Sequence, residues 1–194
     1  QSALNSFGST AMAGATVAGN IEGFVYIAMN SVSQGMLSFT SQNLGAKQYK
    51  RINDILRNCV LALGMIAVIS NILVLLFSKS LAELFTNSEE VVRYAQERMF
   101  IIICPYCLFG LMDVLVGGLR GFGYSFQPMI ISLIGICCTR VFYVLVLFPL
   151  PAFHGLKQLY FSYPVTWVIT LSCLWVLYKK VRNTFPATNE EGVV

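Results

Sequence analysis

The chain has 194 residues, of which 56% are hydrophobic and only 11% are charged. A soluble domain carries roughly 25% charged residues, so this composition excludes an ordinary soluble protein and indicates an all-α integral membrane protein. The net charge of +4 comes from basic residues between apolar runs and does not indicate nucleic-acid binding.

The chain begins with an apolar segment and continues into its first complete membrane span. Residues 1–7 are too few to cross a bilayer, so we interpret them as the remnant of a helix and expect the sequence to be cut from a longer protein. Residues 11–41 form the first full span, because about 30 residues at ~1.5 Å rise exceed the ~30 Å hydrocarbon core. A polar exit follows from Gln42 to Lys47. The basic amphipathic segment that ends at Arg57 is predicted to lie on the membrane surface.

The span over residues 11–41 carries two distinct stripes, since residues four apart share one face of a helix. Small residues, which favour close helix packing, form the first: Ala11, Ala15, Gly19 and Gly23. Polar residues form the second: Glu22, Tyr26, Asn30 and Gln34. The three uncharged ones are equally compatible with lining a cavity and with bonding to neighbouring helices. A carboxylate in the membrane is costly, so Glu22 should face a cavity or a partner, and we favour the cavity because an ionisable group has the larger penalty to offset.

Four further spans are predicted downstream, at residues 58–77, 91–118, 127–148 and 157–178. A polar loop, 78–90, separates the second from the third, and Pro105 is expected to kink the third because it has no N–H to donate. The fold class is therefore a bundle of five full transmembrane helices plus the remnant of a sixth. The transmembrane domain covers residues 1–183, and residues 184–194 form a cytoplasmic tail.

Basic residues are distributed unequally between the two sides of this topology. Connections on one side hold eight of them: Lys47, Lys50, Arg51, Arg57, Arg120, Lys179, Lys180 and Arg182. Connections on the other side hold two: Lys79 and Lys157. Cytoplasmic loops are enriched in Lys and Arg, so the bias predicts a multi-pass protein of the plasma membrane with a cytoplasmic C-terminus.

Three ionisable residues lie deep within predicted spans: Glu22, Asp113 and Arg140. At ~1.5 Å per residue, Glu22 and Arg140 lie ~16 and ~12 Å from the outer ends of their helices, whereas Asp113 is nearer the cytoplasmic face. Depth therefore predicts a buried ion pair between Glu22 and Arg140, either switchable or a static structural bridge, with Asp113 titrating separately.

No enzyme signature is present in the sequence. The motif from Cys104 to Cys107, Cys-Pro-Tyr-Cys, matches that of glutaredoxins, but it lies in an apolar helix rather than a soluble βαβ unit, so we expect ordinary buried thiols. No metal-ligand spacing, phosphate loop or nucleophile–base set occurs. We expect no catalytic residue, no metal and no cofactor beyond a transported coupling ion.

Several motifs in order resemble the C-terminal half of the multidrug and toxic compound extrusion (MATE) family. They are Gln1-Ser2-Ala3-Leu4-Asn5-Ser6-Phe7-Gly8, Asn20-Ile21-Glu22, Gln42-Asn43-Leu44-Gly45-Ala46-Lys47 and Leu119-Arg120-Gly121 with Gly123. The resemblance covers nearly the whole chain. It implies a twelve-helix antiporter of two six-helix lobes around a cavity that opens to alternate sides, with this chain as the second lobe.

Such transporters export organic cations and drugs with a proton or sodium gradient, so the resemblance implies the missing N-terminal lobe, the lipid bilayer and small organic cations as partners. Some members couple through a carboxylate on the tenth helix, and Asp113 is on the matching helix. Tyr26, Phe109 and Tyr143 are the expected aromatic contacts for an organic cation. Two alternatives stay open: a lipid-linked oligosaccharide flippase-like transporter, and a truncated, non-transporting membrane fragment.

Overall fold

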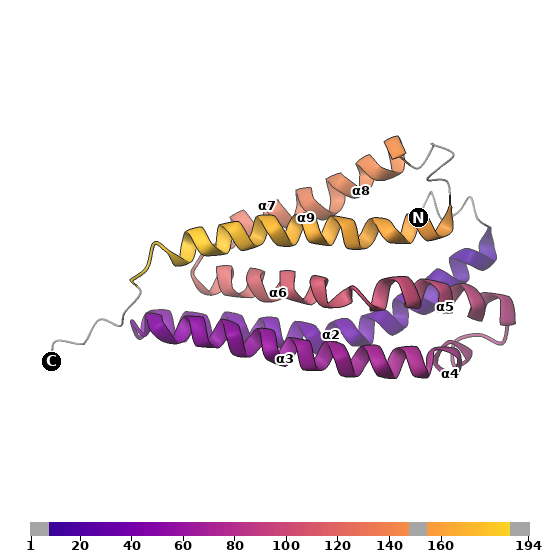
Figure 1. Cartoon of the computed structure of the whole chain (residues 1–194), viewed down its shortest axis with the longest axis horizontal. Coiled ribbons are helices and arrows are strands. Elements are labelled where there is room, and N and C mark those ends of the chain that lie inside the picture. The colour runs from indigo at the N-terminus through magenta and orange to yellow at the C-terminus, as the bar shows by residue number, and fades with distance from the viewer. Residues whose placement is uncertain (1–7, 148–154, 187–194) are drawn as a thin grey trace.

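The computed structural model describes residues 8–147 and 155–186, and every regular element in these ranges is a helix (Figure 1). The remnant predicted at residues 1–7 and residues 187–194 of the predicted tail lie outside the described residues.

The first two helices form a long hairpin. Helix α2 runs over Ser9–Gly45 and α3 over Tyr49–Leu76. The turn between them contains Lys47 at φ 56°, so the polar exit predicted from the sequence does end the first span. The basic segment before residue 58 is not a separate element, because α3 is continuous from Tyr49. Ile52 near its start is fully buried in the bundle.

The third predicted span is two helices. Helix α5 covers Glu89–Ile103 and α6 covers Tyr106–Gly121, and their axes differ by 52°. The break falls at Cys104 and Pro105, which confirms the expected kink and has the expected cause, since proline cannot donate to the helix ladder. The preceding segment, predicted as a loop, contains the short helix α4 over Ser78–Glu83.

The fourth predicted span is a composite helix with two widened sections. In chain order it comprises α7 (Phe126–Ser132), the π-helix η1 (Leu133–Cys138), α8 (Thr139–Phe142) and the π-helix η2 (Tyr143–Leu147). Arg140 is therefore in a single α-turn between two π-helical sections. The last helix, α9, covers Leu156–Arg182.

Hydropathy supports several of these helices as membrane spans. In the described residues, α3, the composite helix over Phe126–Val146 and α9 are long and apolar enough to cross a bilayer, and the bent pair of α5 and α6 makes a fourth if it is one span. Helix α2 has 37 residues but is not among them, because its small and polar residues lower its mean hydropathy. By this criterion of length and hydropathy, the described residues contain three or four candidate membrane spans, compared with the five full spans expected from the sequence.

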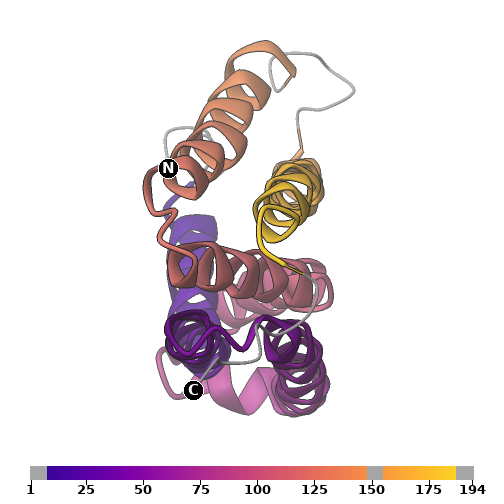
Figure 2. The ribbon, with the colours of Figure 1, turned by 90° about the vertical axis from the view of Figure 1, so that its left-hand side faces the viewer.

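Helix α6 lies inside the bundle, where it packs against α2, α3 and α9. Figure 2 shows α7 to η2 and α3 at opposite ends of the assembly, with α6 between them. Gly117 allows the closest approach of α6 to α2: a Cβ there would be 2.4 Å from the backbone oxygen of Ser33. Small residues on both helices therefore decide which faces of α2 and α6 meet.

Candidate functional site

Glu22 of α2 forms a buried ion pair with Arg98 of α5. The Nε of Arg98 donates to Oε1 and its Nη2 donates to Oε2, each at 2.9 Å. The two side chains are 13% exposed for Arg98 and 9% for Glu22. A planar guanidinium that satisfies both carboxylate oxygens is the geometry that best offsets the cost of burying two charges.

The predicted pair of Glu22 with Arg140 is wrong, because both carboxylate oxygens of Glu22 are taken by Arg98. Arg140 lies instead over the ring of Tyr163, with its guanidinium carbon 3.8 Å from the ring centroid. Arg98, which was not among the residues singled out from the sequence, is ~14 Å along α5 from Glu89 and so at a depth comparable to that of Arg140. Depth alone admitted both arginines, and the packing of α5 against α2 decides between them.

Asp113 belongs to a second network, between α2 and α6. Asn30 donates from Nδ2 to the Asp113 carboxylate at 3.3 Å and also contacts the hydroxyl of Tyr26 at 3.2 Å. Gln34 donates to the Oδ1 of Asn30 at 3.4 Å. The hydroxyl of Ser33 donates to the backbone oxygen of Asp113 at 2.6 Å, which fixes the two helices at this level.

The polar stripe predicted on α2 therefore exists, and it serves two neighbouring helices. Glu22 contacts α5, whereas Tyr26, Asn30 and Gln34 form a hydrogen-bonded row beside α6. The structure brings together three of the predicted site residues: Asp113, Asn30 and Tyr26. It places Glu22 and Arg140 elsewhere, each with a different partner.

The two carboxylates differ in how their charges are compensated. Glu22 has an arginine in contact, whereas within residues 8–147 and 155–186 no lysine or arginine forms an ion pair with Asp113. Its contacts are the amide of Asn30 and its neighbour Tyr26. A carboxylate held only by neutral groups in a membrane bundle is suited to taking up and releasing a cation.

Aromatic rings surround one side of this network. Phe109 lies 5.6 Å from Tyr26 and 5.6 Å from Trp167, measured between ring centroids. Of the expected aromatic contacts, Tyr26 and Phe109 are thus adjacent. Tyr143 is separate, because its hydroxyl donates to the backbone oxygen of Gln158 at 2.8 Å.

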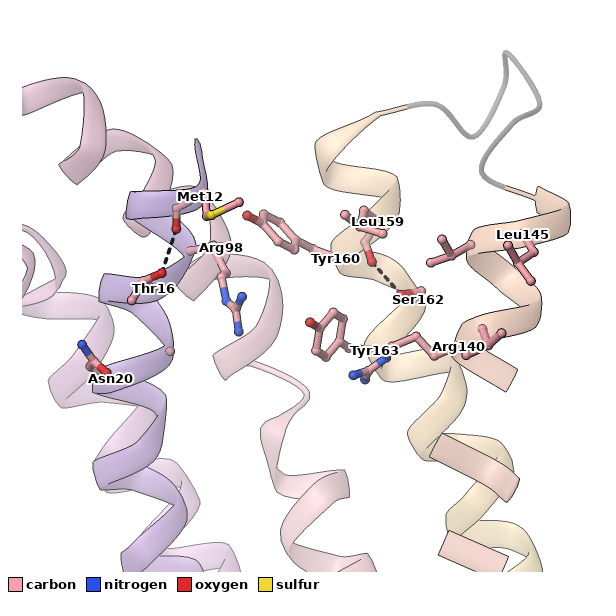
Figure 3. Close-up of a pocket in the computed structure, with 14 residues that line it drawn as sticks. Met12, Thr16, Asn20, Arg98, Arg140, Leu145, Leu159, Tyr160, Ser162 and Tyr163 are labelled. Atoms are coloured by element: carbon pink, nitrogen blue, oxygen red, sulfur yellow. Dashed lines mark hydrogen bonds between the residues drawn. The ribbon is translucent and has the colours of Figure 1, made fainter. Parts of the chain in front are cut away.

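A cavity of about 690 Å³ opens between α2, α5, the α8–η2 section and α9 (Figure 3). Its charged and aromatic lining residues are Arg98, Arg140, Tyr160 and Tyr163, and Thr16, Asn20 and Ser162 add uncharged polar groups. Of the predicted site residues, only Arg140 lines it. Arg98 and Tyr160 were not predicted from the sequence, and the signal for the arginine was a second basic residue well inside an apolar helix.

Comparison with known proteins identifies the family. The MatE family model matches residues 1–146, three quarters of the chain. The chain belongs to the MatE family. This MatE chain is 25% identical over 180 residues to the Probable multidrug resistance protein YoeA of Bacillus subtilis, covering 92% of the chain and 38% of that protein. It is 24% identical over 175 residues to the FAD transporter of Shewanella oneidensis, covering 88% of the chain and 37% of that protein.

The fold of the chain also matches that of a solved MATE transporter. The crystal structure of the Vibrio cholerae MATE transporter VcmN in the bent form superposes with a TM-score of 0.81 at 22% sequence identity, covering 94% of this chain and 41% of that one. The MatE chain thus spans less than half the length of these relatives, and its fold is that of part of a MATE transporter. Two of the matched proteins, the FAD transporter and VcmN, are named as transporters, and MATE transporters are multi-pass membrane proteins.

Proposed function

We propose that this chain forms the second lobe of a cation-coupled multidrug antiporter that exports organic cations or drugs across the plasma membrane. The C-terminus is cytoplasmic in this proposal, and a preceding six-helix lobe completes the transporter. The family membership supports transport, and the excess of basic residues on one side supports the orientation. One relative is named for multidrug resistance and the other for FAD transport. The proposed substrate class is therefore inferred from the residues of the site.

The observation that carries the proposal is the Asp113 carboxylate of α6, which accepts a hydrogen bond from the neutral amide of Asn30 on α2. Binding of a proton or sodium ion there neutralises the charge and lowers the cost of burying the group. A ligand changes a conformational equilibrium only through its different affinity for the two states, and this change in burial cost supplies that difference. The aromatic rings of Tyr26 and Phe109 offer an organic cation a surface beside the same carboxylate.

The test is efflux of ethidium from cells that express the complete reading frame, with the proton and sodium gradients collapsed in turn. Asp113→Asn keeps the size of the side chain and one acceptor oxygen but removes its charge. We expect it to abolish the part of efflux that depends on a gradient. Asp54→Asn, on an exposed position of α3, is the matched control and should retain that part.

The level of protein in the membrane is measured for each variant. If Asp113→Asn is inserted normally and still shows the gradient dependence of the wild type, Asp113 is not the coupling carboxylate. If no gradient affects wild-type efflux, the cation-coupled mechanism itself is wrong.

A further inference from the structure

A cluster of aromatic rings surrounds the first turns of α6, just after the break at Pro105. Tyr106 and Phe109 belong to α6, and Trp167 of α9 lies 5.6 Å from each of them, measured between ring centroids. Trp167 also lies 6.1 Å from Tyr163, about one turn earlier on its own helix. Trp167 is therefore the ring through which α9 contacts this part of α6.

The rings of this cluster differ in their exposure. Trp167 is 3% exposed and Tyr106 is 8% exposed, a burial that the described helices produce by themselves. Phe109 is only partly buried, as is Tyr26 of α2, and the centroids of these two rings are 5.6 Å apart. The cluster thus has a front layer of Tyr26 and Phe109 and a buried back layer of Tyr106 and Trp167.

The front layer lies beside the Asp113 carboxylate. Phe109 precedes Asp113 by four residues and Tyr26 precedes Asn30 by four, so each ring shares a helix face with one member of the polar network. Asn30 connects the two faces, since its amide contacts the Tyr26 hydroxyl at 3.2 Å and the Asp113 carboxylate at 3.3 Å. A flat organic cation at this network meets aromatic rings and a negative charge together.

The two front rings are held in different ways. The hydroxyl of Tyr26 has a polar contact with Asn30, whereas Phe109 has no polar group and is positioned by packing alone. Behind Phe109, Tyr106 comes from the same helix and Trp167 comes from α9. A smaller residue at position 167 leaves a space behind Phe109, into which this ring can turn away from Tyr26.

We propose that Trp167 is a positioning residue for the organic cation: it holds Phe109 against Tyr26 and so keeps the aromatic surface beside Asp113 assembled. It acts through Phe109 and does not itself touch the cation. The inference rests on the proposed function, because it requires that an organic cation binds at the Asp113 network. It extends that function by assigning part of the affinity for flat cations to a buried residue on a third helix, α9.

The test measures equilibrium binding of ethidium to the purified full-length protein in detergent, through the fluorescence anisotropy of ethidium. We expect Trp167→Leu to weaken binding about three- to tenfold, the loss expected when one ring no longer contacts the cation. Trp175→Leu is the matched control, because this second tryptophan of α9 is 42% exposed and packs against Tyr178 and Lys179. It should bind ethidium as the wild type does.

A double-mutant cycle separates positioning from a general loss of packing. If Trp167 acts through Phe109, Trp167→Leu should hardly change the affinity once Phe109 is replaced by alanine, so the two effects are not additive. A merely structural role gives the same loss in both backgrounds. Uptake of ethidium into inside-out vesicles gives a second readout: Trp167→Leu should raise KM and keep the maximal rate and the gradient dependence of the wild type.

Equal ethidium affinity in the wild type and Trp167→Leu would overturn the inference, as would equal losses in the two backgrounds. If Trp167→Leu is not inserted, Trp167→Met takes its place with the same expected loss, because methionine fills the space but has no flat face. Gradient-independent uptake by a wild type that binds ethidium contradicts the coupling and leaves this inference standing. A wild type that does not bind ethidium contradicts the proposed substrate class, and the inference with it.

Discussion

Replacing Glu22 by glutamine tests whether the buried pair with Arg98 holds α2 against α5. The variant keeps the shape of the side chain and removes its charge, which leaves the Arg98 guanidinium without a counter-charge in a position that is only 13% exposed. Arg98 has other contacts with the rings of Tyr160 and Tyr163, at 5.6 and 5.7 Å, but these offset only part of the loss.

The size of the effect follows from the geometry. At the observed 2.9 Å contacts and an effective dielectric constant near 20, the gross attraction between the two charges is about 6 kcal/mol. Removing one partner of a buried pair generally costs about 3–5 kcal/mol, because the other charge stays buried and uncompensated. We therefore expect Glu22→Gln to lower the free energy of unfolding by about 3 kcal/mol or more, a large share of the ~5–15 kcal/mol typical of proteins.

The chain supplies its own control in the pair of Lys79 and Glu83. These groups are 3.7 Å apart, with side chains 70% and 51% exposed. Such an exposed pair contributes only ~0.3–0.5 kcal/mol, so Glu83→Gln should hardly change the unfolding free energy. Both variants are compared with the wild type by reversible unfolding in SDS, followed by circular dichroism.

A double-mutant cycle separates the pair from its surroundings. Glu22→Gln combined with Arg98→Gln should recover part of the loss, because no unpaired charge then stays buried, and we expect a coupling energy of about 2 kcal/mol. The reasoning is refuted if Glu22→Gln costs no more than Glu83→Gln, or if the two single effects at the buried pair simply add.

Two further predictions concern packing at other levels of the bundle. Gly117→Ala should destabilise the protein by about 1–3 kcal/mol in the same SDS assay, because its Cβ would be 2.4 Å from the backbone of Ser33. Gly23→Ala on α2, where nothing is within 4 Å, should be neutral or slightly stabilising, and the reverse order would contradict the packing. Arg182→Gln should cost about 2 kcal/mol and expose the start of α3 to proteolysis, since Arg182 donates to Asn53 Oδ1 at 3.0 Å and is only 9% exposed. Unchanged cleavage there would show that α3 is held by its other contacts.

The sequence alone predicted the features that depend on neighbouring residues in the chain. Hydropathy indicated a helical membrane protein, and the missing N–H of Pro105 predicted the break now seen between α5 and α6. The spacing of four residues predicted the polar row of Tyr26, Asn30 and Gln34, whose members do bond to one another along α2. Each of these is a local property, so no knowledge of helix packing was required.

The partners of the charged residues were decided only by the tertiary structure. A sequence gives the depth of a residue along its helix, but it does not give the direction in which the side chain points or the neighbour that it meets. Arg98 and Arg140 are at comparable depths, and the contact of α5 with α2 pairs the first with Glu22 and leaves the second at Tyr163. The cavity is lined by residues of elements that are distant in the sequence, so it became visible only when the helices were assembled.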